Sequence, residues 1–230
     1  MKKNGSRASR RNKGAALILG LFLVILFFAI PLPYYAILPG DLVSTEQLIH
    51  VENKDTHILV TSAKIAENPL AYWFRLAPDK YHLSIFGFFV SRISHTATIE
   101  SIAVPMNVDP VLAQNYAQGL DVAELLAGQY LGINVTVNST GASGGSASLP
   151  IALELVHQYG PDLVKGRKIA ATGDLLENGT VVPVGGIAQK LIVAERDNVD
   201  IFIIPQQETP LTKLNIVKVN TFSEAVEALQ

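Results

Sequence analysis

Cysteine is absent from this chain of 230 residues, and so are two motifs that would mark common kinds of site. Without cysteine there can be no disulfide framework, no thiolate metal site and no cysteine nucleophile. The five histidines are scattered and show no metal-ligand spacing such as His-Glu-x-x-His. A Walker-type phosphate-binding loop does not occur either. We therefore expect no metal, no nucleotide and no other cofactor, and no ATP-driven unfolding machinery.

Charge is scarce as well, and it is unevenly distributed. Charged residues make up 17% and apolar residues 49% of the sequence, which indicates a packed core rather than disorder. Six of the 18 basic residues precede residue 14, where no acidic residue occurs: Lys2, Lys3, Arg7, Arg10, Arg11 and Lys13. The other 12 stand against 20 acidic residues, so the rest of the chain has a net charge of −8. An acidic body of this kind argues against a nucleic-acid partner, which requires a basic surface.

The first uncharged run of the chain predicts a membrane anchor. No charged residue occurs between Gly14 and Leu38, and at about 1.5 Å rise per residue a helix of this length can cross a hydrocarbon core of about 30 Å. The preceding cations favour a basic cytoplasmic tail over 1–13, a single transmembrane helix over 14–38 and an extracytoplasmic location for the rest. A cleaved signal peptide shares these features, but its small-x-small cleavage pattern is missing after the apolar core. The prediction is therefore an uncleaved anchor in the cell membrane.

The extracytoplasmic region expected between 39 and 132 is less informative. Aromatic residues are frequent between 70 and 89, and we expect them to pack in a core rather than to form a membrane-surface or substrate-contacting patch. Apolar residues at helical spacing from Pro110 onward predict a helix that ends at Gly132. A small mixed α/β region is the prediction for this part of the chain.

The first candidate for chemistry is a serine in a loop of small residues. Residues 141–145 read Gly-Ala-Ser-Gly-Gly, between an alternating, strand-like segment at 133–137 and apolar residues that recur at helical spacing after Gly145. Ser143 is therefore expected near a helix amino terminus, where free backbone amides can stabilise the oxyanion of a tetrahedral intermediate. Taken alone, the same loop is more simply explained as a helix cap.

The Gly-x-Ser-x-Gly spacing of this loop also matches the nucleophile elbow of α/β-hydrolases. Such enzymes need an Asp or Glu and then a His further along the chain. After Ser143 the only histidine is His157, and only Glu154 lies between the two. These residues are far too close together for strands to separate them, so an esterase-type triad is excluded.

A lysine decides between a helix cap and a nucleophile. In a helix, the neighbours of Lys190 at three and four positions are all small or apolar: Gly186, Ile187, Val193 and Ala194. Burial among such neighbours disfavours the ammonium form and lowers the pKa of the amine. A neutral amine can then take the proton of a serine hydroxyl. The alternative, which is the simpler one for a lysine considered alone, is a side chain that extends along the surface to water.

Together, three motifs in this order resemble the Lon-type serine–lysine peptidases, peptidase family S16. Residues 141–145 look like the family's Gly-Pro-Ser-Ala-Gly loop. Residues 171–174, which read Ala-Thr-Gly-Asp, look like its Thr-Gly-Glu hairpin when taken with the turn and glycine pair at 178–186. Residues 187–191 place Lys190 where the family has its general base, 47 residues after Ser143.

By this resemblance Ser143 is the nucleophile, Lys190 the general base and Thr172 a hydroxyl that orients the lysine amine. The resemblance covers 133–230 and implies the α+β fold of the Lon proteolytic domain, similar to the second domain of ribosomal protein S5. Two residues of the serine loop depart from the family's pattern, because Ala142 and Gly144 replace its proline and alanine.

The anchor, together with Leu-Pro-Gly at 38–40, looks like the membrane-anchored Lon-like peptidases of Gram-positive bacteria. We expect their PDZ domain to be absent here, since Gly132 runs directly into the segment at 133. The prediction is a membrane-anchored, ATP-independent serine endopeptidase that forms an acyl-enzyme and cleaves flexible peptides or exposed segments of proteins. The alternative is a catalytically silent domain that binds peptides or partner proteins at the membrane. A homo-oligomer is left open.

Overall fold

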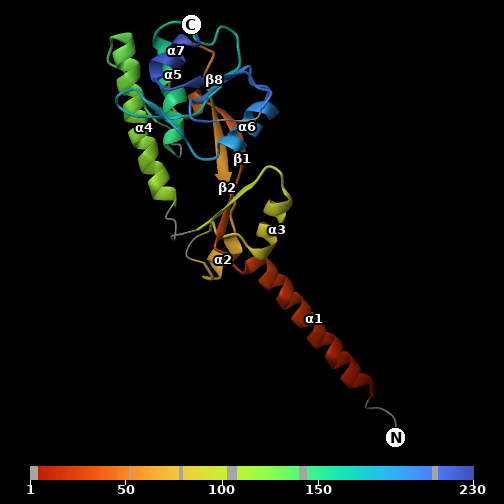
Figure 1. Cartoon of the computed structure of the whole chain (residues 1–230). Helices are drawn as coiled ribbons and strands as arrows, with labels where there is room; N and C mark the ends of the chain where they lie inside the picture. Colours follow the sequence, from red (N-terminus) through yellow and green to blue (C-terminus); the bar gives the residue numbers. More distant parts are fainter. Residues whose placement is uncertain (1–4, 52, 78–79, 103–107, 140–143, 209–211) are drawn as a thin grey trace. The chain divides into compact units, whose positions relative to one another are not determined.

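The structure, a computed structural model, describes residues 5–51, 53–77, 80–102, 108–139, 144–208 and 212–230. The chain divides into two compact units (Figure 1). Unit 1 comprises Met1–Ile37 and Ile65–Met106, and unit 2 comprises Leu38–Lys64 and Asn107–Gln230. The predicted peptidase domain, 133–230, lies wholly within unit 2.

Unit 1 contains the amino-terminal helix α1, which spans Gly5–Ala29. Its other elements are the first part of β1 (Tyr34–Ser44), α2 (Pro69–Trp73), α3 (Ile85–Ile93) and β3 (Thr98–Ser101), which pairs antiparallel with β1. The aromatic residues of this unit pack only in part as predicted. Phe86 lies against Phe28 with ring centroids 4.5 Å apart, whereas Trp73 is 72% exposed.

The predicted transmembrane anchor is wrong. Among the residues that the structure describes, no helix is both long and apolar enough to cross a membrane. The uncharged run is divided between two elements, because it is helical only as far as Ala29 and continues as a strand from Tyr34. From Gly14 to Ala29, at about 1.5 Å per residue, a helix measures only about 24 Å, less than the hydrocarbon thickness of about 30 Å. The predicted single-pass location in the cell membrane is overturned by the same finding.

Unit 2 is built on parallel strands. β2 (Leu59–Ile65), β4 (Ile169–Ala171), β7 (Ile201–Pro205) and β8 (Ile216–Val219) are neighbours in this order, and each pair is parallel. Residues of β4 and β7 alternate between two cores, since Ile169 and Ile203 face the larger one while Ala170 and Phe202 face the smaller one. Burial on both faces is typical of parallel strands and explains their nearly continuous apolar sequences.

Helices cover both cores of unit 2. The larger core receives α4 (Val108–Leu131), α5 (Ser148–Tyr159) and α7 (Phe222–Glu227), and the smaller core receives α6 (Ile187–Arg196). In Figure 1, α4 runs alongside α5 at one side of this unit. Two short helical turns, η1 (Thr45–Gln47) and η2 (Gly145–Ala147), and the hairpin of β5 (Asp174–Leu175) and β6 (Val181–Val182) complete it. This mixture fits the predicted α+β class.

Two of the helices in unit 2 were predicted from their periodicity, and one predicted strand does not form. The helix expected from Pro110 to Gly132 is α4, and the helix expected after Gly145 is α5. The alternating segment at 133–137 is not a strand. The backbone N–H of Val137 donates to Oε1 of Glu124 at 2.8 Å, so a side chain takes the donor that a strand partner would otherwise satisfy.

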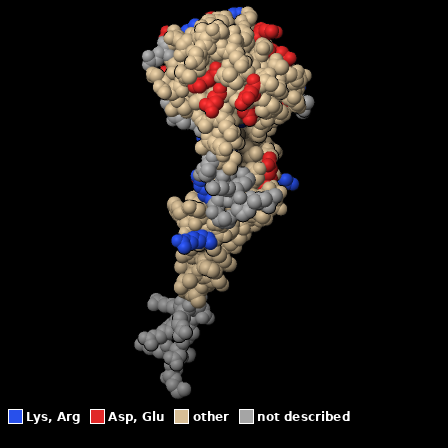
Figure 2. All heavy atoms as spheres, turned by 90° about the vertical axis from the view of Figure 1, so that its left-hand side faces the viewer, with Lys and Arg blue, Asp and Glu red and all other residues tan. Residues whose placement is uncertain are grey.

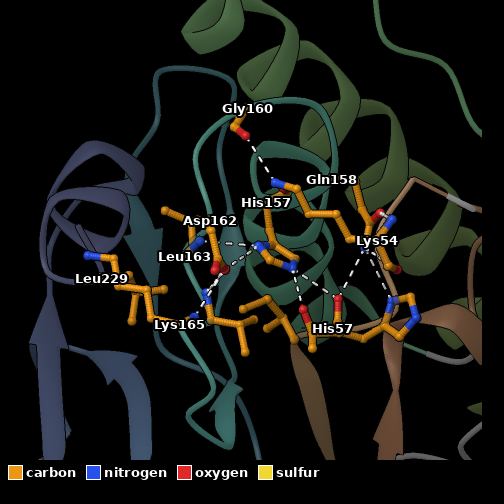
Figure 3. A network of polar contacts seen from close by, with 12 residues as sticks. Lys54, His57, His157, Gln158, Gly160, Asp162, Leu163, Lys165 and Leu229 are labelled. Carbon is orange, nitrogen blue, oxygen red and sulfur yellow. Dashed lines mark hydrogen bonds and ion pairs between the residues drawn. The ribbon is translucent and has the colours of Figure 1, made fainter.

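A buried polar network joins the segment before β2 to α5 (Figure 3). Glu154 has no exposed surface and accepts hydrogen bonds from the Ile58 backbone (2.6 Å) and from Gln158 Nε2 (2.7 Å). Its Oε1 also lies 2.7 Å from Nδ1 of His57. The ammonium of Lys54 contacts carbonyl oxygens at the end of α5, a favourable place for a cation.

His157 is the second ionisable residue of this network that is fully buried. Its Nε2 donates to the carbonyl oxygen of Thr56 (3.0 Å), and its Nδ1 accepts from the backbone N–H of Leu163 (3.1 Å). One donor and one acceptor correspond to a neutral imidazole. Burial lowers the pKa of His157 and so favours the same form. Glu154 and His157 therefore have structural partners, as expected for residues that form no catalytic triad.

Candidate active site

Lys190 lies on α6, the helix that closes the smaller core. The helix begins after Gly186, whose φ of 69° is a left-handed conformation that glycine adopts without strain. Leu191 and Ala194 of the same helix belong to the core. Lys190 is only 4% exposed, so the burial predicted from its small and apolar neighbours is confirmed.

With the residues that the structure describes, the amine of Lys190 makes a single hydrogen bond. Its Nζ donates to Oγ1 of Thr172 at 3.0 Å, and the structure records no ion pair of Lys190 within the part of the chain that it describes. Burial lowers the pKa of Lys190 to about 8, while the carboxylate of Glu208 has an opposing effect. An amine with this pKa exists partly in the neutral form near physiological pH and can accept a proton.

Thr172 connects this amine to a loop from elsewhere in the sequence. It follows β4 directly, and its backbone N–H donates to the carbonyl of Ile203 (3.0 Å), which extends the pairing of β4 with β7. Its fully buried side chain accepts the hydrogen bond from Lys190, and its Oγ1 lies 3.5 Å from the carbonyl oxygen of Ser146. The contact with Lys190 is the one that an orienting role of Thr172 requires; the role itself stays a prediction.

The predicted nucleophile, Ser143, lies outside the residues that the structure describes, which resume at Gly144. The structure explains why glycine occupies the two positions after Ser143. Gly144 has a φ of 96°, which favours glycine. A Cβ on Gly145 would lie 2.8 Å from the carboxylate of Asp174, so the backbone approaches that side chain too closely for a larger residue.

Hydrogen bonds fix the start of α5 against the residues that follow β4. The backbone N–H of Gly173 donates to the carbonyl of Ser146 (3.2 Å), and that of Leu149 donates to the carbonyl of Gly173 (3.3 Å). Ser148, which is 1% exposed, accepts from the backbone N–H of Leu175 (2.8 Å). Its hydroxyl also lies within hydrogen-bonding distance of the Gly173 carbonyl (3.3 Å) and of the Asp174 carboxylate (3.2 Å).

Sequence reasoning did not single out Ser146 or Ser148. One signal was available, because both serines lie at the start of the predicted helix, closer to it than Ser143 does. The sequence does not predict that the carbonyl of Ser146 contacts Thr172.

A groove of about 440 Å³ runs beside this loop. It is lined by residues of α4 between Asn115 and Val122 and by residues 174–177. Figure 2 shows the side of the molecule on which α4 lies, where acidic side chains gather on the face of unit 2 and basic ones lie only at its edge. This distribution agrees with the acidic balance of the sequence and argues against a nucleic-acid partner on that face.

Comparison with known proteins identifies the family. Residues 100–222, more than half of the chain, match the family model of the Lon protease (S16) C-terminal proteolytic domain. The chain belongs to this family. The resemblance of its motifs to Lon-type peptidases is thereby confirmed at the level of the family, and membership in the Lon family supports a serine peptidase.

Curated Lon proteases resemble the chain over part of its length. It is 30% identical over 95 residues to the Lon protease of Mycolicibacterium smegmatis and 32% identical over 96 residues to that of Salinispora arenicola. It is 34% identical over 95 residues to the mitochondrial Lon protease homolog of Drosophila melanogaster. These matches cover 40 to 41% of this chain but only 9 to 12% of the relatives, so the chain corresponds to a small part of each Lon protease.

Proposed function

We propose that the chain is a serine endopeptidase that cleaves flexible peptides or exposed protein segments without a nucleotide. The observation that carries the proposal is the buried amine of Lys190, whose pKa is lowered to about 8 and which donates a hydrogen bond to Thr172. Burying a lysine without an ion-pair partner is unfavourable for folding. A general base that works near neutral pH, in contrast, requires such an environment.

In the proposed mechanism, the neutral amine of Lys190 accepts the proton of a serine hydroxyl, and the serine oxygen bonds to the carbonyl carbon of the scissile peptide. The positive end of the α5 dipole, next to the serine loop, favours the resulting oxyanion. The ammonium of Lys190 then gives its proton to the leaving amine, the C–N bond breaks and an acyl-enzyme ester remains. Water hydrolyses this ester with Lys190 again as the base. The serine predicted from the sequence is Ser143, and Thr172 keeps the amine directed at the loop.

The test uses the full-length chain and a fluorescently labelled unstructured protein, with no nucleotide added. Replacing Lys190 by Ala or Arg should lower kcat/KM by about 10³- to 10⁴-fold, because alanine cannot accept the proton and arginine stays protonated. For the unaltered chain, kcat/KM should rise with pH through about 8, as the amine of Lys190 loses its proton.

Equal cleavage by the unaltered chain and both Lys190 variants would refute the serine–lysine mechanism. Cleavage that strictly required ATP would refute its independence of nucleotide. If the chain bound peptides but neither cleaved them nor reacted with a fluorophosphonate, the alternative of a catalytically silent binding domain would be favoured instead.

A further inference from the structure

Ser146 lies next to the side chain that holds the lysine amine. Two contacts in series connect them: Nζ of Lys190 is 3.0 Å from Oγ1 of Thr172, and this oxygen is 3.5 Å from the carbonyl oxygen of Ser146. The backbone N–H of Gly173 donates to the same carbonyl (3.2 Å). Backbone contacts thus hold Ser146 beside the Lys190–Thr172 pair, and neither of these two contacts uses its side-chain hydroxyl.

The hydroxyl of Ser146 also differs from that of its neighbour Ser148. Ser148 is 1% exposed, and its hydroxyl is engaged with Leu175, Gly173 and Asp174. Ser146 is partly exposed, and the structure records no hydrogen bond of its hydroxyl with any residue that it describes. A nucleophile must be reached by the substrate and must be free to give its proton to a base, so only Ser146 of these two serines meets both requirements.

The surroundings of Ser146 suit an attack on a peptide carbonyl. It lies in η2 immediately before α5, so it stands at the amino-terminal, positive end of the helix dipole, which favours a developing oxyanion. On its other side, Gly144 and Gly145 carry no side chain that would keep a substrate backbone away.

We propose that Ser146, three residues after the predicted Ser143, supplies the attacking hydroxyl. This inference rests on the proposed function, because it names the nucleophile of the same serine–lysine site. The Oγ–H proton of Ser146 passes to the neutral amine of Lys190 while Oγ bonds to the scissile carbonyl carbon. As the C–N bond breaks, the proton passes on to the leaving amine, and the acyl ester forms on Ser146. Hydrolysis of the ester consumes one water molecule and returns the proton to Ser146.

The experiment labels the full-length chain with a fluorophosphonate and maps the modified peptide by mass spectrometry. The label is expected on Ser146. Ser146→Ala should lose labelling and lower kcat/KM by about 10³-fold or more, and the modified peptide of Ser143→Ala should still carry the label on Ser146. Circular dichroism and thermal unfolding of both variants show whether the fold is retained.

A cysteine variant distinguishes loss of the nucleophile from a structural effect of Ser146→Ala. Ser146→Cys keeps a nucleophile in place and should be inactivated by iodoacetamide faster than Ser143→Cys, with a rate that falls when Lys190 is also replaced. Labelling of Ser143, with Ser143→Ala inactive and Ser146→Ala active, would overturn the assignment to Ser146 and leave the proposed function standing. Full activity of Lys190→Ala, with no serine labelled, would overturn both.

Discussion

Unit 2 buries two sets of ionisable side chains, and it satisfies them very differently. Around Glu154 and His157, donors and acceptors are matched by the backbone of Ile58, Thr56 and Leu163 and by the side chain of Gln158. Lys190 is almost as deeply buried, yet its amine has one recorded hydrogen bond and, among the residues that the structure describes, no ion pair. The fold satisfies the first set. The charge of the second, in the described part of the chain, is opposed only by the Coulombic effect of the Glu208 carboxylate and has no ion-pair partner.

The difference separates a structural role from a chemical one. A buried polar network whose groups are all paired makes the local packing specific, and removing one member is costly. A lysine whose pKa falls from 10.5 to about 8 instead lowers the stability at neutral pH by about 3 kcal/mol. Both sets adjoin α5. The network of Glu154 and His157 holds the second half of this helix, and the serine loop beside the Lys190 site leads into its start. The network therefore fixes the helix at whose start the proposed chemistry takes place.

The largest effect on stability is expected from breaking the network. Glu154→Ala would leave the buried N–H of Ile58 and the side chain of Gln158 without their acceptor. We expect the free energy of unfolding in urea to fall by about 3–5 kcal/mol. Glu154→Gln keeps the volume and one acceptor oxygen, so its loss should be smaller. Under conditions in which each variant is folded, kcat/KM should stay within a few-fold; a large loss of activity without a loss of stability would place the network in the catalytic site.

The second prediction is a gain in the free energy of unfolding. Lys190→Met keeps an unbranched apolar side chain and removes the ammonium, so below pH 8 it should raise the free energy of unfolding by about 2–3 kcal/mol while abolishing cleavage. Because the folded chain releases the lysine proton near pH 8 and the unfolded chain only near 10.5, stability of the unaltered chain should rise between these values. The advantage of the variant should therefore shrink over this interval. Equal stability of the two chains at pH 7 would mean that burial of the amine is compensated.

The comparison also indicates how much of the site could be predicted from the sequence. The burial of Lys190 followed from helical spacing, because α6 places small or apolar residues on each side of it. The motif around Thr172, in contrast, was recognisable only from its resemblance to the family's Thr-Gly-Glu hairpin. The position of Ser146 was not predictable in this way. Its relation to Lys190 depends on a contact with residues 172–173, which fold against it from 26 residues further along the chain.

The wrong predictions have a common physical origin, in that a local pattern was overruled by pairing elsewhere. The uncharged run after Gly14 was interpreted as one helix, but Tyr34 pairs with Ser101 in β1 and β3, so the run ends as a strand. Alternation at 133–137 predicted a strand, but Glu124 of α4 takes the N–H of Val137. Hydropathy and periodicity record which residues can be buried; they do not record which distant segment supplies the hydrogen-bond partners.

The smallest effect tests how Lys190 is oriented. Thr172→Val keeps the shape of the side chain and removes the hydroxyl that accepts the hydrogen bond from Nζ. The amine should then sample other directions, and kcat should fall by about 10- to 100-fold, equivalent to about 1.4–2.7 kcal/mol, with little change in KM. Thr172→Ser keeps the hydroxyl and should retain most of the activity.

This pair of variants distinguishes orientation from packing. Both remove or alter a methyl-sized group at a fully buried position, so both should lose some stability. Only the valine variant loses the acceptor, so only its kcat should fall if the hydroxyl orients the amine. Similar losses of kcat in the serine and valine variants would show that Thr172 acts through packing, and that Lys190, unlike Glu154 and His157, is held by the apolar core alone.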